Sequence, residues 1–318
     1  MTETNTDIDV LQERLAEVRE EVGKRIIGQR DVLERLLVCI IADGNALLES
    51  NPGLGKTTMV RTVAEVTGLD FSRVQNTPDL MPSDITGTEV IRDSGETRAF
   101  VFDKGPIFAN IVLADEINRA TPKTQAALLE AMQEKQVTAA GETYDLPRPF
   151  LVLATQNPVD QEGTYPLPEA QTDRFLLKLV LDYPAAEEER DIVNLYTGSG
   201  SGSAPPVETV VTRSEIRQIQ SLAREMPIAD DVRDRAIELV RATREAETVE
   251  FGASPRASMG LVLTAKARAF LRGRAHVSWE DVAEMAPPVL RHRILLDFRA
   301  EREGLTADDV IATLVDEV

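Results

Sequence analysis

Short apolar runs alternate with amphipathic stretches over the first 184 residues of the chain. Three runs, at 46–48, 111–114 and 150–154, contain no polar residue and have the length of strands buried on both faces. The strands expected from this pattern are 46–48, 71–75, 111–114, 150–154 and 175–181, and the helices are 9–24, 32–41, 59–64 and 122–134. Strands that alternate with helices in this way predict an α/β fold, with a parallel sheet flanked by helices.

The pattern changes after Pro184, where the strand-like runs stop. Residues 197–206 are rich in Gly, Ser and Pro, as flexible linkers are. The helices expected beyond Pro184 are 185–196, 214–226, 230–246, 255–272, 278–285 and 307–315, with Ser254, Ser278 and Thr306 as caps of the last three. We therefore expect two domains, an α/β core over residues 1–184 and an all-helical domain over residues 185–318.

Residues 81–105 interrupt the α/β pattern with Gly, Pro and polar residues. Two stretches within them, 88–91 and 98–102, alternate apolar and polar residues on either side of the turn-like sequence Asp93-Ser94-Gly95. This arrangement predicts a hairpin insert at about 88–102.

The segment between the first strand and its helix has the composition of a phosphate-binding loop. Its glycines let several backbone N–H groups point at one anion, Lys56 adds a positive charge near the phosphates, and the Thr57 hydroxyl can bind Mg²⁺. The residues expected to bind the nucleotide here are Asn51, Pro52, Gly53, Leu54, Gly55, Lys56, Thr57 and Thr58. The loop departs from the full pattern at Ser50, where a glycine is usual, and this leaves the first turn of the loop in question.

Two acidic residues follow the apolar run 111–114 directly. Ligands of open α/β sheets bind at the carboxyl ends of the strands, so Asp115 and Glu116 are expected close to the phosphates. Asp115 suits the Mg²⁺ shell through the water ligands of the metal, together with Thr57, and Glu116 suits polarising an attacking water. These residues predict ATP and Mg²⁺ as cofactors.

The net charge of −19 arises from 54 acidic and 35 basic residues, of which only seven are lysine. Such a surface repels nucleic acid, because phosphate contacts need clustered cations. It resembles the surfaces of proteins from salt-saturated cytoplasm, where molar salt screens the mutual repulsion of carboxylates. An ordinary acidic bacterial protein is the alternative.

The rarer residue types argue against several other classes of protein. Cys39 has no second cysteine to pair with and lies in an apolar run, which favours a core position. With His276 and His292 as the only histidines, a Cys/His metal site is not expected. The polar N-terminus does not look like a signal peptide, and no apolar stretch reaches the roughly twenty residues that span a bilayer. We expect a cytoplasmic protein without membrane insertion.

Taken in order, these motifs resemble the MoxR group of AAA+ ATPases, and the resemblance covers nearly the whole chain. The segments that carry it are 105–110, 113–120, 122–132, 154–158, 163–171, 173–175, 252–256 and 289–293. It implies a phosphate-loop AAA+ core followed by a helical lid domain. It also implies that the hairpin at 88–102 is the helix-2 insert of this clade, projecting toward a central pore or a substrate.

The resemblance also implies roles for individual residues. Asn157 resembles sensor 1, which helps to place the attacking water, although an Asn-Pro turn is the alternative. Arg174 resembles an arginine finger that reaches a neighbouring subunit, and the alternative is a surface salt bridge with Asp173. Arg256 resembles sensor 2, which brings the lid onto the same nucleotide, or else it is structural. The adenine-side wall is expected at Ile27, Gly28 and Gln29, which are otherwise a loop between helices.

A finger that acts in a neighbouring subunit implies a head-to-tail homo-oligomeric ring, a hexamer by resemblance. The resemblance further implies a chaperone that remodels or activates partner proteins, often ones with a von Willebrand A domain. A nucleic-acid motor or clamp loader, the ATPase subunit of a metal chelatase, and a nucleotide-binding scaffold that hydrolyses nothing are the alternatives. Glu116, Asn157 and Arg174 argue against the scaffold, because binding alone does not require them.

Overall fold

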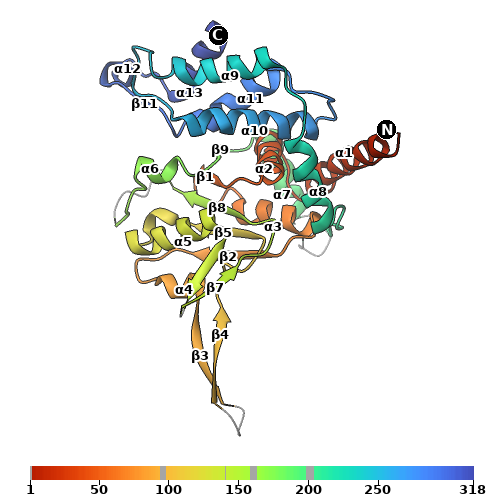
Figure 1. Ribbon diagram of the computed structural model, residues 1–318, viewed down its shortest axis with the longest axis vertical. Coiled ribbons are helices and arrows are strands. Elements are labelled where there is room, and N and C mark those ends of the chain that lie inside the picture. The colour runs from red at the N-terminus through yellow and green to blue at the C-terminus, as the bar shows by residue number, and fades with distance from the viewer. Residues whose placement is uncertain (1, 94–97, 140, 158–162, 198–203) are drawn as a thin grey trace.

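A five-stranded parallel sheet, in the order β2-β5-β8-β1-β9, forms the centre of the molecule (Figure 1). The computed structural model describes residues 2–93, 98–139, 141–157, 163–197 and 204–318. The strands are β1 (Ala46–Ser50), β2 (Phe71–Gln75), β5 (Ile111–Asp115), β8 (Leu151–Gln156) and β9 (Leu177–Leu181). All five expected strands are therefore confirmed, and each pairs with its neighbours in parallel.

Helices cover both faces of this sheet, which explains the continuous apolar runs of its central strands. Ile111 and Leu113 of β5 belong to a core shared with α1 (Thr2–Gly23), α2 (Arg30–Ile41) and α3 (Lys56–Val66). Val112 and Ala114 of the same strand belong to a second core with α5 (Pro122–Glu134). Successive side chains of a strand point to opposite faces, so a strand between two cores must be apolar at every position.

A second body of helices, here called the helical domain (residues 230–318), packs on the side of α2 away from the sheet. It contains α9 (Asp230–Ala242), α10 (Pro255–Leu271), α11 (Trp279–Leu290), α12 (Phe298–Arg302) and α13 (Ala307–Glu317). Ser254, Ser278 and Thr306 are the N-cap residues of three of these helices, as expected. A two-stranded sheet of β10 (Val249–Phe251) and β11 (Leu295–Leu296) adds to the helices, and the sequence pattern did not indicate it.

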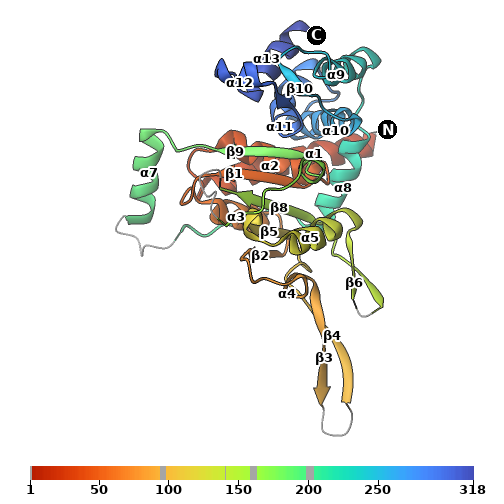
Figure 2. The ribbon, with the colours of Figure 1, turned by 90° about the vertical axis from the view of Figure 1, so that its left-hand side faces the viewer.

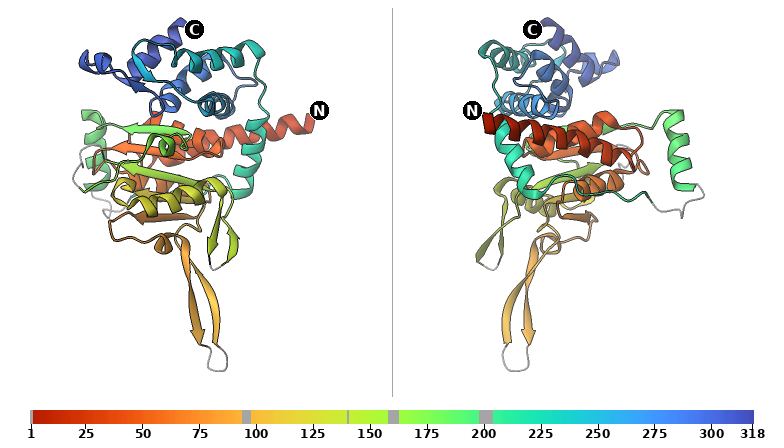
Figure 3. Two further views of the ribbon diagram at one scale, coloured as in Figure 1. Left: turned by 60° about the vertical axis from the view of Figure 1, so that its left-hand side comes forward. Right: turned by 90° about the vertical axis from the view of Figure 1, so that its right-hand side faces the viewer.

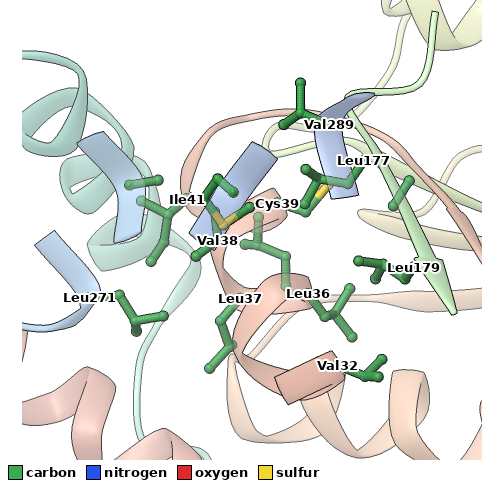
Figure 4. Close-up of a cluster of buried hydrophobic side chains, with 14 of the residues drawn as sticks. Val32, Leu36, Leu37, Val38, Cys39, Ile41, Leu177, Leu179, Leu271 and Val289 are labelled. Carbon is green, nitrogen blue, oxygen red and sulfur yellow. The ribbon is translucent and has the colours of Figure 1, made fainter. Parts of the chain in front are cut away.

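Helix α2 joins the two bodies through apolar contacts (Figure 4). Its buried side chains, including Leu36 and Cys39, lie between Leu177 of β9 and the residues Leu271 and Val289 of the helical domain. Cys39 is fully buried, and burial raises the pKa of its thiol. The cysteine is therefore a core residue, as expected. Helix α1 lies along the same boundary (Figure 3).

Two segments project from the body. The expected hairpin consists of β3 (Gly87–Asp93) and β4 (Arg98–Lys104) and points away from the helical domain (Figures 1 and 2). Helix α7 (Ala186–Thr197) stands apart from the body and buries none of its residues (Figure 2). Helix α8 (Arg213–Arg224) then returns the chain to α1 and α2.

The remaining elements are short. They are α4 (Pro82–Thr86), a 3-10 turn at Ile117–Arg119, α6 (Glu169–Thr172) and a second hairpin of β6 (Gln136–Ala139) and β7 (Glu142–Asp145). The second hairpin was not expected. It braces the first, because the ring of Tyr144 stacks on Phe102 with centroids 4.2 Å apart.

Candidate nucleotide-binding site

The loop between β1 and α3 has the backbone of an anion site. Gly53 and Gly55 lie in the left-handed region, with φ of 85° and 76°, and no atom lies within 4 Å of a Cβ built on either. The positive φ is therefore the reason that glycine is needed at both positions, because a Cβ there would meet no neighbouring atom. Gly55 is the N-cap of α3 and makes no side-chain cap bond, so the first N–H groups of the helix, from Lys56 onward, are left to face an anion.

Ser50 does not disturb this loop. It is the last residue of β1 and is buried, and its hydroxyl donates to the carbonyl of Asn51 at 3.0 Å. Among the described non-glycine residues, only Gln29, Asp43, Glu116 and Lys135 have positive φ. Because Ser50 is not one of them, its backbone conformation does not require the glycine that is usual at this position.

A cavity of about 460 Å³ opens beside the loop, a volume typical of small-molecule sites. The structure brings the loop together with Ile27 and Gln29 around this cavity. The lining residues are Arg25, Ile26, Ile27, Gln29, Pro52, Gly53, Leu54, Gly55, Thr58, Met59, Tyr183, Pro184, Glu189, Ile192 and Tyr196. The last five come from the β9–α7 segment and were not expected from the sequence.

Hydrogen bonds hold the walls of this cavity together. The Gln29 side chain donates to the carbonyl of Asp182 at 2.7 Å, and the Tyr196 hydroxyl donates to the carbonyl of Arg25 at 3.4 Å. The carboxyl group of Glu188 lies over Gly28, where a Cβ would be 2.6 Å from it. Gly28 has a φ of 69°, so its backbone conformation favours glycine, whereas the Glu188 carboxyl is the end of a flexible side chain and could move aside.

Asp115 lies at the end of β5, buried, and both of its carboxylate oxygens are hydrogen-bonded. Oδ1 accepts from the Thr155 hydroxyl at 2.6 Å, and Oδ2 accepts from Nη2 of Arg73 at 2.5 Å. Thr155 and Arg73 come from the strands on either side of β5, and neither was expected from the sequence. The register Gln75↔Asp115 and Ala114↔Ala154 brings them to one edge of the sheet.

Glu116 has a strained backbone, with φ of 55° and ψ of 52°. For a residue with a Cβ this conformation costs on the order of 1 kcal/mol, and such strain is common at functional sites. Its amide donates to the Thr155 hydroxyl at 2.8 Å, and its Oε2 accepts from Gln75 at 3.0 Å and from Arg119 at 3.2 Å. Two neighbouring side chains thus hold the carboxylate at the sheet edge, and a third, Thr155, holds the backbone of Glu116.

The other predicted residues divide between two places. Asn157 directly follows β8, the strand beside β5. Arg256 does not line the cavity, and its Nη1 is paired with Oδ2 of Asp173 at 2.8 Å. Arg174 forms no ion pair within the described part of the chain, so the alternative of a salt bridge with Asp173 is not observed. The roles of Asn157, Arg174 and Arg256 stay predictions.

Asp173 is the centre of an ion-pair cluster beside Arg174. Its Oδ1 accepts from Nε of Arg293 at 2.8 Å, and Ser254 lies within 3.2 Å of Oδ2. Burial alone would raise the pKa of the Asp173 carboxyl, but the hydrogen bond from Arg293 and the charges of Arg293 and Arg256 outweigh it, so this pKa lies below its ordinary value.

The donor set suits Mg²⁺ bound together with a nucleotide. Magnesium in such sites keeps several waters and takes one or two protein oxygens, with the phosphates supplying the rest. Thr57 lies in the first turn of α3, and Asp115 offers oxygens held by Thr155 and Arg73. No group of three His, Cys, Asp or Glu side chains with metal-binding geometry occurs in the described residues. The residues therefore fit a nucleotide-bound metal better than a metal held by the protein alone.

Comparisons with known proteins agree with this geometry. Residues 45–177 match the model of the ATPase family associated with various cellular activities (AAA), and residues 241–314 match an AAA lid domain. The chain is 44% identical to chaperone MoxR1 of Mycobacterium tuberculosis, over 92% of this chain and 78% of that protein. It is 43% identical to the uncharacterized protein YeaC of Bacillus subtilis, over 96% and 94%.

The crystal structure of a candidate ATPase from Cytophaga hutchinsonii superimposes with a TM-score of 0.93 at 42% identity, covering 100% of this chain and 98% of that one. None of the helices in the described residues has the length and apolar character to cross a membrane. The fold, the loop and these relatives together show that the chain belongs to the MoxR family of AAA+ ATPases.

Proposed function

We propose that this protein is a Mg²⁺-dependent ATPase that hydrolyses ATP to ADP and phosphate and uses the energy to remodel partner proteins. The observation that carries the proposal is the placement of Glu116 on a strained turn at the end of β5, at the same sheet edge as the uncapped N-terminus of α3. The backbone N–H groups of the loop and Lys56 bind the phosphates. The apolar walls, from Ile27 to Ile192, take the adenine.

Glu116 and Asp115 have separate roles in this proposal, and neighbouring polar residues assist each of them. Glu116 orients and polarises the attacking water, with Asn157 on the adjacent strand end as its partner. Thr57 and Asp115 are the residues that would hold Mg²⁺, Asp115 through water. When bound, the metal neutralises charge that develops on the phosphates. The Thr155 hydroxyl fixes both acids, because it donates to Asp115 and accepts from the Glu116 amide.

The proposal includes a head-to-tail ring, a hexamer, in which Arg174 of one subunit completes the site of the next. One relative carries the name chaperone MoxR1, and this name supports a chaperone activity here. We also propose the division at residue 184, a cytoplasmic location, and adaptation to high salt on the ground of the −19 charge.

The proposed partner is a protein with a von Willebrand A domain, which the β3–β4 hairpin would contact. Ile91 and Phe100 face each other across this hairpin and are 62% and 71% exposed. A nucleic-acid motor is the second candidate. The sequence of the hairpin, residues 87–104, contains four acidic residues and three basic ones. This balance favours a protein partner.

Two substitutions test the hydrolytic reaction. Lys56→Ala should lose nucleotide binding, because the phosphates lose the cation of the loop. Glu116→Gln should bind ATP and stall, because an amide cannot polarise the water, and Glu130→Gln on the exposed side of α5 is the matched control. Binding of a fluorescent ATP analogue and release of phosphate measure the two effects. A wild-type turnover rate in Glu116→Gln would refute the role of this carboxylate.

A further inference from the structure

The segment that carries Arg174 is held by one side chain of the helical domain. Arg293, which follows α11, donates from Nε to Oδ1 of Asp173 at 2.8 Å and from Nη2 to the carbonyl of Asp173 at 3.1 Å. It also donates to the carbonyl of Phe175 at 2.5 Å and to the carbonyl of Leu176 at 3.1 Å. These acceptors lie on both sides of Arg174 in the chain.

Only a guanidinium can make this set of bonds. Its five N–H donors lie in one plane, whereas a lysine has a single ammonium group. The Arg293 side chain is 2% exposed, so its bonds are not replaced by water. Burial lowers the pKa of Arg293, and Asp173 counteracts this by hydrogen bonding and charge. Arg293 therefore holds residues 173–176 through buried hydrogen bonds, of which the one to the Asp173 carboxylate is charge-assisted.

Arg174 itself is left out of this cluster. Its backbone N–H bonds to the carbonyl of Gln171 at 3.2 Å, while its side chain is partly exposed and forms no ion pair within the described residues. The neighbours of Arg174 are thus fixed and its guanidinium is available. This is the arrangement that a group acting on another subunit requires.

We propose that Arg293 is a positioning residue for Arg174, so that the helical domain sets the geometry of the site in the adjacent subunit. The proposal rests on the proposed role of Arg174 as a finger that acts in trans. Arg293 is not among the residues that line the nucleotide cavity of its own subunit. Its effect on turnover therefore passes through the segment 173–176.

Arg293→Lys keeps the positive charge and loses the planar set of N–H donors. A displacement of a reacting group by about 1 Å can cost about 100-fold in rate, so we expect kcat to fall roughly 10- to 100-fold. Affinity for a fluorescent ATP analogue should stay within about threefold, because the cavity is untouched. The matched control is Arg291→Lys. Arg291 is a buried arginine two residues away. It binds Asp308 at 2.8 Å and the carbonyl of Lys178 at 3.4 Å, and within the described residues it makes no hydrogen bond to residues 173–176.

Mixing of subunits separates a finger defect from a pocket defect. Lys56→Ala subunits have a disabled loop and an intact Arg174, so they should restore turnover to Arg293→Lys subunits in mixed rings. Arg174→Ala subunits have an intact loop and no finger, so they should not restore it. The opposite pattern, rescue by Arg174→Ala and none by Lys56→Ala, would show that Arg293 acts on its own pocket and would overturn the proposal.

Two further outcomes distinguish a failure of the role of Arg293 from a failure of the trans role of Arg174. Wild-type turnover in Arg174→Ala would refute the proposal that Arg174 acts as a finger in the neighbouring subunit. A large loss in Arg174→Ala, together with equal activities of Arg293→Lys and Arg291→Lys, would refute only the role of Arg293. If Arg293→Lys does not assemble, Asp173→Asn weakens the same contact without changing side-chain size, and it should give the same mixing pattern. Rescue of Asp173→Asn by Arg174→Ala would likewise overturn the proposal.

Discussion

His292 makes the stability of this protein depend on pH in a predictable direction. Its Nε2 lies 3.0 Å from the carbonyl of Phe175, so Nε2 carries the proton in the neutral ring, while its Nδ1 is buried without a hydrogen-bond partner in the described structure. Burial, followed by the charge of Arg293, lowers the pKa of His292 from 6.5 to about 3. The folded protein therefore keeps this ring neutral at pH values where the unfolded chain protonates it.

The size of the effect follows from the two pKa values. Above pH 6.5 the ring is neutral in both states, so it does not change the free energy of unfolding. As pH falls from 6.5 toward 3, the unfolded state binds a proton that the folded state does not. The free energy of unfolding then falls by as much as about 1.4 kcal/mol per pH unit. Between pH 7 and pH 5 the integrated loss is about 2 kcal/mol. This is an upper value, because His292 as a residue is partly exposed.

His292→Gln tests this value, because glutamine keeps a donor toward the carbonyl of Phe175 and does not titrate. Urea unfolding at constant ionic strength between pH 7 and pH 5 should show a smaller loss of stability in His292→Gln than in the wild type, by up to about 2 kcal/mol. The matched control is His276→Gln at an exposed position, and it should follow the wild type. Parallel losses in the wild type and His292→Gln would refute the reasoning.

Two further predictions concern surfaces. Ile91→Ser together with Phe100→Ser should leave basal ATPase intact and abolish binding of a von Willebrand A domain measured by calorimetry, because both exposed apolar side chains lie on the projecting hairpin; hairpin-dependent stimulation of the ATPase by DNA or RNA would instead favour the nucleic-acid motor. The unfolding midpoint and the assembled fraction should rise with KCl from tenths molar to molar, because salt screens acidic surfaces such as the groove lined by Glu13, Glu17, Glu20, Glu21 and Glu208; a flat midpoint would contradict the adaptation to high salt.

The sheet and its loop could be predicted because their patterns are local. The strands β5 and β8 lie between two cores and are therefore apolar over residues 111–114 and 151–154, and the glycines at 53 and 55 follow from the backbone of the loop itself. The pair β10–β11 was missed because its strands are three and two residues long and lie more than forty residues apart. A strand this short has no period to detect.

The contacts around Asp115 and Glu116 could not be predicted for a related reason. Arg73, Gln75 and Thr155 reach the two acids only because the strands β2 and β8 pair with β5 in one particular register. In the sequence Arg73 is one polar residue in a mixed strand. The walls of the cavity from Tyr183 to Tyr196 depend in the same way on where α7 lies in space.

Arginines make several of the polar contacts between the two bodies of this molecule. The helical domain meets the rest of the chain through apolar packing on α2 and through polar contacts that include two ion-pair clusters, Glu34 with Arg272 and Asp173 with Arg256 and Arg293. Arg272 binds both oxygens of Glu34, at 2.8 and 2.6 Å, which a lysine could not do in one geometry. The arginines at this boundary therefore neutralise nearby carboxylates and also fix the orientation of the helical domain. The helical domain can therefore transmit its position to residues 173–176.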